Sequence, residues 1–565
     1  MMQIIYTVLS CCRRVKKRLS LRELELDVNK TKREDFLNAF IALKSLPATD
    51  PDSFFAIASY HGMPYKPREV PPPHIPPNDT NNSAWGGYCQ HANILFPTWH
   101  RFYCLKLEQA LQKALPGGDV MLPYWDQTSP ENLRSGLPPL LVDQTVTIDG
   151  EEKPNPLLNF SYNAPIPMPP DDINPDANAQ YYVKGETDTT VRYPFSGVTN
   201  PAHAAAIAVE HNKMIENMDA TPDELLRRNF IRWLTAGMEV KLDPPKFYNS
   251  IHSEYAGSLK VSSYNKFSNT ESAGSQFCLE QAHNEVHLAV GGWTPPDLRE
   301  DDSAVTDENG DPTFGLIYGS NGDMGANETA AFDPCFFLHH CNVDRMFWVW
   351  QKKYAATETI TLDTDPKDLG LSNIGQGPTP DQVPNQQLNF QTPLAPFTDA
   401  SNNRKLTSVD CFDVTKLGYD YSIGSLDQEN WLQLPQAYDY IDIEGRSWKD
   451  IAAKLLKVVD NAGKPAVVSF DSTSFEQATP DSTIVPVQYS TQGGDSPIVK
   501  IGRHLFMLKT NFTVRNIQKD SMAGSFAVYA FYRKDGKLYF IGQRGVLSRW
   551  DRKNCKNCTK HPYAT

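Results

Sequence analysis

Three features are scarce in this sequence of 565 residues, and each scarcity argues against a class of protein. No run of about 18 apolar residues occurs, so no membrane-spanning helix is expected. The net charge of −13 leaves no excess of basic residues, which disfavours a nucleic-acid partner. The ten cysteines form only two close pairs, Cys11–Cys12 and Cys555–Cys558. This is no dense disulfide framework, and it suits an intracellular chain.

The first residues lack the order of a secretory signal. The apolar stretch Met1–Cys12 is short, and its basic cluster, which begins at Arg13, follows the apolar part instead of preceding it. No small-residue cleavage site closes the stretch. We therefore expect an intracellular, cytoplasmic location rather than secretion, although an ill-defined chain start explains the segment equally well.

The composition supports a large core with long loops. Apolar residues make up 40 % of the chain and aromatic residues 11 %, while 43 prolines limit long helices. Residues 19–26 look strand-like, and residues 127–200 look like a long irregular insertion. Helical spacing predicts helices at these places: residues 36–43, 94–115, 201–218, 223–237, 274–290 and 335–355.

The pattern changes towards the C-terminus. Apolar and polar residues alternate in 498–512 and 525–532, and the turn Lys534-Asp535-Gly536 leads into another alternating run, which predicts a hairpin. We expect a mainly α catalytic domain over residues 1–424 and a smaller β-rich domain over residues 425–565.

Seven of the 13 histidines stand in three local clusters. His283 and His287 lie four positions apart in a helical pattern, so they share one face. At about 100° per residue, Glu280 and Asn284 fall on the same face and Glu285 points away. This order differs from the HExxH motif of zinc proteases, where the glutamate follows the first histidine directly.

A second predicted helix begins near Pro334 and carries His339 and His340. One of these two histidines should bind a metal, while the other points about 100° away. Asp344, four residues after His340, is placed to orient a ligand imidazole.

The third cluster contains His61, His91 and His100, with Cys89 two residues before His91. Cys89 is open to three interpretations: a metal ligand, a buried thiol or a covalent partner. Taken alone, each histidine is better explained as a core residue. Together, two sets of three imidazoles predict two metal ions, and they suit copper, although imidazole also binds zinc.

These residues resemble the tyrosinase (polyphenol oxidase) family of type 3 copper proteins, in its fungal, latent form. The similarity rests on Gly87–His91 with Trp99–Arg101, on Leu122–Asp126, and on Asp333–Phe336 with His340 and Asp344. It implies a four-helix-bundle domain with long loops and a dinuclear copper site. The copper ligands it implies are His61, His91 and His100 for copper A, and His283, His287 and His340 for copper B.

The resemblance also implies roles for residues around the coppers. Cys89 matches the cysteine that forms a thioether with His91, and Phe336 matches a phenylalanine packed on a copper B ligand. Glu280 and Asn284 match a pair that holds a water for deprotonating the phenol; the alternative is a hydrogen-bonded pair that only orients His283. Asn327 occupies the position of a residue at the substrate entrance.

Two further motifs match the family outside the copper site. Tyr419-Asp420-Tyr421 resembles a tyrosine motif that pairs with an N-terminal arginine, here Arg18 or Arg22. The C-terminal region resembles a domain that covers the coppers until an activating protease removes it, and its CxxC is linked to copper loading. The aromatic residue that plugs the site in some members has no clear counterpart near Val546.

The predicted function is o-hydroxylation of monophenols and oxidation of o-diphenols to o-quinones with dioxygen, for melanin synthesis. The expected partners are phenolic small molecules, dioxygen and an activating protease, and the sequence leaves room for a homo-oligomer. Three alternatives remain at this point: a catechol oxidase without monophenolase activity, a haemocyanin-like dioxygen carrier, and a zinc hydrolase.

Overall fold

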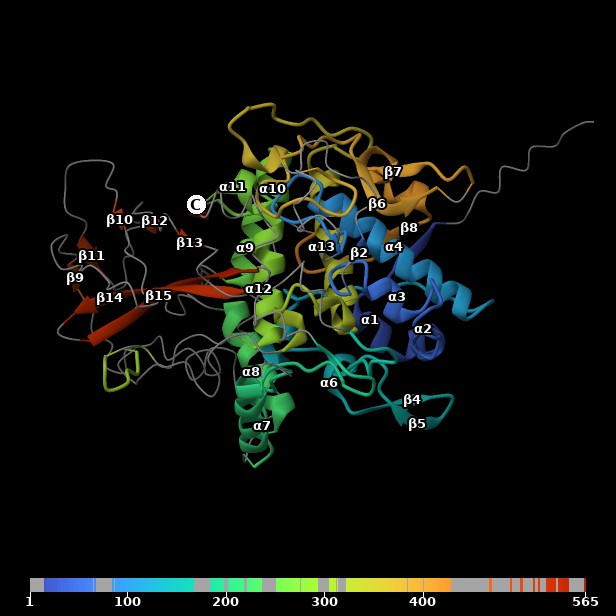
Figure 1. Ribbon diagram of the computed structural model, residues 1–565, viewed down its shortest axis with the longest axis horizontal. Helices are drawn as coiled ribbons and strands as arrows, with labels where there is room; N and C mark the ends of the chain where they lie inside the picture. Colours follow the sequence, from blue (N-terminus) through green and yellow to red (C-terminus); the bar gives the residue numbers. More distant parts are fainter. Residues whose placement is uncertain are drawn as a thin grey trace, which may run out of the picture.

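The computed structural model is mainly α-helical around a large apolar core, with small two-stranded sheets at its edges (Figure 1). It describes residues 15–64, 66–67, 84–85, 87–166, 183–197, 202–217, 221–235, 250–274, 276–292, 304–310, 312, 322–383, 385–399, 401–427, 467–469, 488–489, 498–500, 512–513, 517–518, 525–534, 537–547 and 563–564. The expected plug position near Val546 lies within these ranges, whereas the CxxC pair and the Met1–Cys12 segment lie outside them.

Four helices form the centre of the molecule. Helix α4 (Phe96–Ala114) packs on α13 (Cys335–Lys353), α13 packs on α12 (Leu279–Gly291), and α12 packs on α9 (Ile251–Ser258). This chain of contacts confirms the mainly α fold. The other α-helices in the described residues are α1 (Leu21–Glu25), α2 (Lys30–Lys44), α3 (Phe54–Ala58), α5 (Pro130–Ser135), α6 (Pro139–Val142), α7 (Ala202–Glu216), α8 (Pro222–Thr235), α10 (Tyr264–Ser268) and α11 (Thr270–Ala273).

The strand-like prediction for residues 19–26 was wrong. Residues Leu21–Glu25 form helix α1, because Ser20 and Glu23 make a capping box in which each side chain binds the other's backbone N–H. The strand lies just before, as β1 (Lys16–Arg18), and it pairs in parallel with β8 (Tyr419–Tyr421). This pairing attaches the N-terminal segment to the last part of the central helical body.

The segment predicted as irregular contains short elements. Helices α5 and α6 lie in it, followed by a hairpin of β4 (Thr145–Ile148) and β5 (Glu151–Pro154).

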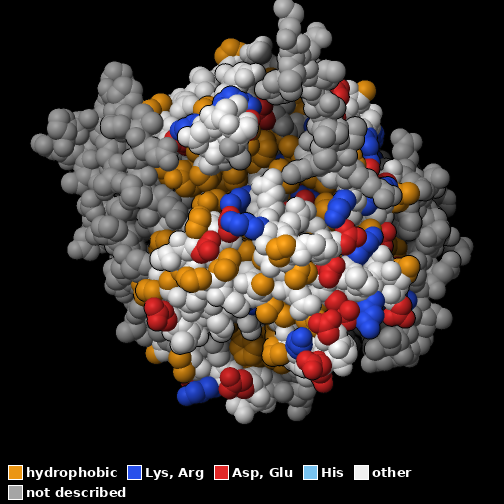
Figure 2. Space-filling view, turned by 90° about the vertical axis from the view of Figure 1, so that its right-hand side faces the viewer, with side chains coloured by type: hydrophobic (Ala, Val, Ile, Leu, Met, Phe, Trp, Pro, Cys, Tyr) orange, Lys and Arg blue, Asp and Glu red, His pale blue; other side chains and the backbone are white. Residues whose placement is uncertain are grey.

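The face of the molecule that lies to the right in Figure 1 carries acidic and basic side chains close together (Figure 2). No helix within the described ranges is long and apolar enough to span a membrane.

The C-terminal hairpin is confirmed as β14 (Phe526–Lys534) paired antiparallel with β15 (Lys537–Val546). The remaining described strands are β2 (Lys66–Pro67), β3 (Ala84–Trp85), β6 (Pro393–Thr398), β7 (Lys405–Thr407), β9 (Val467–Ser469), β10 (Gln488–Tyr489), β11 (Ile498–Lys500), β12 (Phe512–Thr513), β13 (Ile517–Gln518) and β16 (Tyr563–Ala564).

Strand β15 packs on α12, where Gly545 N donates to Glu285 Oε1 at 2.8 Å and Gln281 Nε2 donates to Gly545 O at 3.0 Å. These two side chains lie on the face of α12 that points away from His283 and His287. The described hairpin therefore contacts the outer side of this helix.

Candidate dinuclear metal centre

Three imidazoles meet where α12 faces α13. His283 and His287 lie one turn apart on α12, and His340 lies on α13. The Nε2 atom of His340 is 3.1 Å from Nε2 of His283 and 3.2 Å from Nε2 of His287. Tetrahedral ligands at about 2.0 Å from a metal lie about 3.3 Å apart, so this spacing fits one metal ion.

The hydrogen bonds of these rings leave lone pairs directed at one another. His287 Nδ1 donates to the carbonyl of Met324 at 2.7 Å, and His283 Nδ1 donates to Asn284 Oδ1 at 2.9 Å. Each ring then carries its proton on Nδ1, so Nε2 is the free acceptor. The Nε2 lone pairs of His283 and His287 both point at Nε2 of His340, which can offer at most one proton. A metal cation at this place would bind all three nitrogens.

Burial keeps the imidazoles neutral. It lowers the pKa of His287 to about 4 and the pKa of His100 to about 3, since the charged ring would lose its hydration. The same cause lowers the pKa of His283 and His340 well below the ordinary value. Neutral imidazole is the form that binds metal, so these rings are ready to bind at neutral pH.

The second trio consists of His61, His91 and His100. Only His100 belongs to a long helix, α4, whereas His61 and His91 lie in loops. His61 Nδ1 donates to the carbonyl of Asn327 at 3.0 Å, and His100 Nδ1 donates to the carbonyl of Phe96 at 2.8 Å. Both rings therefore present Nε2 as an acceptor, as in the first trio.

The two trios adjoin each other. The rings of His100 and His340 stack with centroids 4.5 Å apart, and those of His91 and His283 are 5.5 Å apart. Phe336 stacks on His340 at 3.9 Å and lies 4.8 Å from the His61 ring. The structure thus brings together all six histidines that the sequence singled out, and their donor set fits two copper ions.

The comparisons with known proteins agree with this geometry. The family model described as the common central domain of tyrosinase matches residues 51–353, which is more than half of the chain. The chain belongs to the tyrosinase family. Members of this family hold a dinuclear copper site, and the chain is accordingly a copper-dependent oxidoreductase.

Both bacterial and fungal tyrosinases are similar to the chain. A tyrosinase of Hahella sp. is 34 % identical over 96 % of this chain and 86 % of its own length. A tyrosinase of Aspergillus oryzae is 32 % identical over 79 % of this chain and 83 % of its own. The solved tyrosinase of Burkholderia thailandensis at low pH aligns with a TM-score of 0.67 and 32 % identity, covering 96 % and 89 %.

In this tyrosinase-family site, Cys89 is buried close to His61 and His91. Its Sγ atom and one ring nitrogen each of His61 and His91 all lie within 4.8 Å of one another. Gln376 spans the turn, since its side chain accepts from His91 N and donates to Cys89 O at 2.5 Å. Gln376 stands in a loop with no motif around it, so no local signal pointed to this role. The predicted thioether stays a prediction.

Glu280 and Asn284 are both buried, but they bind different groups. The Glu280 carboxylate accepts from Ala92 N at 2.7 Å and from Thr270 N at 2.9 Å, so it fixes the turn after His91. The Asn284 side chain binds His283. These contacts orient residues of both trios, and the predicted role of the pair in deprotonating a phenol stays a prediction.

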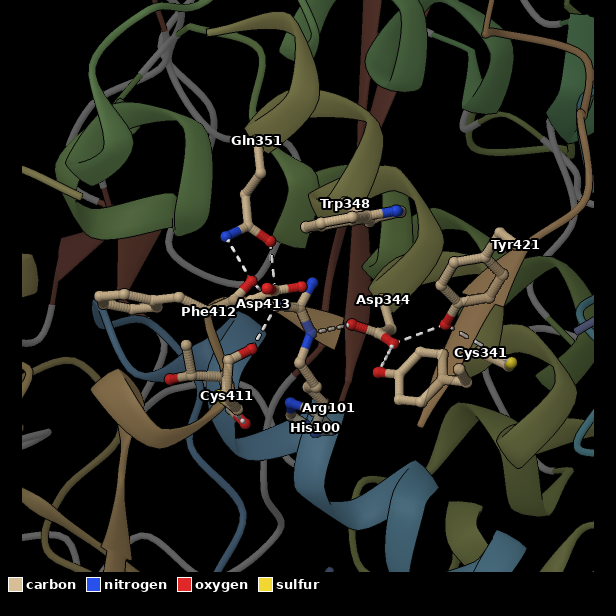
Figure 3. Close-up of polar contacts among 12 residues, drawn as sticks. His100, Arg101, Cys341, Asp344, Trp348, Gln351, Cys411, Phe412, Asp413 and Tyr421 are labelled. Atoms are coloured by element: carbon tan, nitrogen blue, oxygen red, sulfur yellow. Dashed lines mark hydrogen bonds and ion pairs between the residues drawn. The ribbon is translucent and has the colours of Figure 1, made fainter. Parts of the chain in front are cut away.

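The expectation for Asp344 needs correction, because its carboxylate binds arginine and tyrosine side chains instead of an imidazole. It accepts from Arg101 Nε and Tyr421 OH, both at 2.5 Å, and from Tyr419 OH at 2.6 Å (Figure 3). Arg18 completes the network 3.3 Å away. Asp344 and Glu108, whose Oε2 lies 2.8 Å from Arg18 Nε, together balance the charges of the two buried guanidinium groups, and Asp344 joins α4 to α13.

Arg18 is the N-terminal partner of the tyrosine motif. Its Nη1 donates to Tyr421 OH at 2.9 Å, and its guanidinium lies 3.5 Å from the centre of the Tyr419 ring. The alternative, Arg22, instead donates to Asn132 and Ser135. The structure therefore decides between the two arginines that the sequence left open.

His339 lies closer to the centre than its helical position predicted. A ring nitrogen of His339 lies within 4.8 Å of those of His283, His287 and His340. However, Gln127 Nε2 donates to His339 Nδ1 at 3.1 Å, and the Gln127 oxygen is itself held by Asn342. This arrangement leaves the His339 proton on Nε2, which removes the lone pair that a metal would need. His340 therefore remains the better ligand.

Asn327 is buried, with 4 % of its surface exposed. Its backbone carbonyl holds His61. Its predicted place at the substrate entrance stays a prediction.

Proposed function

We propose that the chain is a tyrosinase that hydroxylates monophenols and oxidises o-diphenols to o-quinones with dioxygen. The observation that carries the proposal is the pair of adjoining imidazole trios, one of them with nitrogens 3.1 and 3.2 Å apart. His61, His91 and His100 would hold copper A, and His283, His287 and His340 would hold copper B. Bound copper would hold dioxygen and pass to it the electrons taken from the phenolic substrate.

The residues of the chain orient these ligands and exclude water from them. Carbonyls of Phe96, Met324 and Asn327 fix three rings, and the Asn284 side chain fixes a fourth. Phe336 covers the side between the trios. Rings that are already oriented lose little freedom when metal and substrate bind, which is the usual benefit of a preorganised site.

We propose that Glu280, acting with Asn284, accepts the proton of a monophenol. A Glu280→Gln variant tests this role against the alternative of a purely structural carboxylate. If Glu280 accepts the proton, the variant loses tyrosine hydroxylation and retains most catechol oxidation. If Glu280 only holds the turn after His91, both activities fall together with copper A content.

Turnover of tyrosine and of a catechol by the copper-loaded chain decides the reaction class. Oxidation of both substrates supports a tyrosinase, and oxidation of the catechol alone makes the chain a catechol oxidase. Reversible oxygen binding without any turnover would make it a carrier of the haemocyanin kind. Hydrolytic activity with zinc as the bound metal would contradict the proposal altogether.

We also propose a latent form with residues 1–424 as the catalytic domain and residues 425–565 as the covering domain. Ser425 and Asp427, at the start of the proposed covering domain, bind Asp126 and Arg345 of the helical body, so the chain stays attached to the catalytic domain just after the proposed boundary. An activating protease, melanin as the end product, a homo-oligomer and a cytoplasmic location complete the proposal. Limited proteolysis followed by a catechol assay tests latency, because a latent chain gains activity on cleavage.

A further inference from the structure

One short segment touches both trios. Residues 322–329, named the cradle below, include the 3₁₀ turn η4 (Asp323–Gly325). The Met324 carbonyl accepts from His287 at 2.7 Å, and the Asn327 carbonyl accepts from His61 at 3.0 Å. The cradle therefore orients one proposed ligand of copper B and one of copper A.

The cradle is packed tightly on both sides. Met63 N donates to Glu328 O at 2.9 Å, and Gly322 N donates to Gly291 O at 2.9 Å. A Cβ atom on Gly62 would lie 2.6 Å from Cα of Glu328, and one on Gly291 would lie 2.9 Å from the carbonyl carbon of Met324. Because both contacts are backbone against backbone, the cradle cannot shift without moving the residues beside both trios.

Asp323 anchors the cradle to the insertion that precedes α7. Its Oδ2 accepts from Val191 N at 2.8 Å, and its Oδ1 lies 3.2 Å from Lys184 Nζ. Lys184 also donates to Gly197 O at 3.0 Å. The side chain of Lys184 is only 4 % exposed and that of Asp323 only 1 %. Removing either partner would leave the other charge buried without compensation.

We propose that Asp323 and Lys184 are positioning residues that lock the cradle and thereby set both copper trios together. The inference rests on the copper ligands assigned under the proposed function. Neither side chain has a hydrogen bond to an imidazole among the described contacts, so each acts through the cradle backbone. Loss of this lock should loosen both coppers rather than one.

The test measures copper affinity in full-length Asp323→Asn and Lys184→Met variants. Copper ions alone are titrated against a competing chelator, and copper per chain is counted. Partners of ligand residues typically contribute about 10–100-fold to metal affinity, so both coppers should bind about 10–100-fold more weakly. Lys184→Arg keeps the charge and should restore affinity close to that of the parent.

Lys44→Met is the matched control. Lys44 donates to the carbonyls of Pro156 at 3.0 Å and Asn159 at 2.6 Å, so it supports the same insertion away from the cradle. It should lower the stability of the metal-free chain in urea without changing copper affinity. Unchanged affinity in both Asp323→Asn and Lys184→Met, loss of one copper only, or an equal loss in Lys44→Met would each overturn the proposal.

The outcomes separate this inference from the proposed function. If Asp323→Asn fails to fold, Lys184→Met and its Lys184→Arg counterpart decide the question. A parent chain that binds two coppers but oxidises no phenol would refute the tyrosinase proposal, and the affinity comparison would still stand. A parent chain that binds no copper would refute both.

Discussion

The two histidine trios are built in different ways. All three copper B residues lie on the packed helices α12 and α13, and their Nε2 atoms are 3.1 and 3.2 Å apart around His340. In the copper A trio, His61 and His91 stand in loops, and the three ring centroids are 5.1 to 5.8 Å apart. Helix packing thus brings the copper B trio together, although Met324 also orients His287, whereas two loops and one helix bring the copper A trio together.

This difference predicts which substitutions weaken binding of each copper. Copper B should depend on its own imidazoles and on the packing of α12, because the helix places two ligands one turn apart. Copper A should depend on supports that are distant in sequence, such as Gln376 and the carbonyl of Asn327. Substitutions that leave the imidazoles in place should therefore harm copper A more easily.

The largest effect is expected from the adjacent pair on α13. His340→Asn removes a proposed copper B ligand, so we expect about one copper per chain and no detectable phenol oxidation. His339→Asn should keep both coppers, because Gln127 holds His339 in the wrong tautomer for binding. Metal analysis of the two purified variants checks this. Equal copper loss in both would mean that His339 is a ligand as well.

The predictability of the two halves follows the same division. Helical spacing alone placed His283, His287 and Asn284 on one face, and the structure shows the two rings 4.4 Å apart. No spacing rule connects His61 with His91, so the cluster could be noted from the sequence, but its assignment to copper A came only from the family resemblance.

Contacts between residues that are distant in the sequence could not be predicted. Asp344 was expected to face an imidazole, but nothing local showed that Arg18 and Arg101 would surround it from other segments. Gln376 was missed for the same reason. Pairings over large sequence distances depend on the whole fold, whereas helical periodicity depends only on neighbouring residues.

The next largest effect is expected from two glycines that press on the cradle. Gly62→Ala pushes on Glu328 beside copper A, and Gly291→Ala pushes on Gly325 beside copper B. Overpacking of this kind costs about 1–3 kcal/mol in the free energy of unfolding. If the halves were independent, each variant would release only its own copper. With a shared cradle, chelator titration should show both coppers loosened in both variants, with copper A affected more.

A smaller effect is expected on the outer side of the copper B helix. Glu254 lies beside Arg544 of β15 at 3.7 Å, and burial raises its pKa from 4.5 to about 7. The folded chain therefore binds a proton that the unfolded chain has lost. The contribution of protonated Glu254 to the free energy of unfolding is complete below about pH 4.5. It is lost as the pH rises through 7.

Urea unfolding of the metal-free chain at several pH values measures this contribution. Between pH 4.5 and 7, the contribution of Glu254 to the free energy of unfolding should decline by up to about 1.4 kcal/mol per pH unit. Glu254→Gln should remove that part of the slope, since its amide does not titrate. Parallel pH profiles for the variant and the parent would show that Glu254 is ionised in the fold and would contradict this prediction.

The smallest effect is expected where the two halves share one ring. Phe336 stacks on His340 at 3.9 Å and also meets His61 at 4.8 Å, so it supports a residue of each trio. An aromatic pair contributes about 0.5–1.5 kcal/mol beyond burial, so Phe336→Leu should weaken copper binding by about 2- to 10-fold. Both coppers should respond, because the same ring steadies both imidazoles.

Phe337→Leu is the matched control for this prediction. Phe337 is the next residue on α13, is equally buried, and packs on Tyr103 at 4.8 Å and Phe54 at 6.0 Å. It should lower the stability of the chain to a similar degree and leave copper affinity unchanged. If Phe336→Leu loosened copper B alone, the His61 contact would be mere packing, and the cradle would be left as the main link between the two trios.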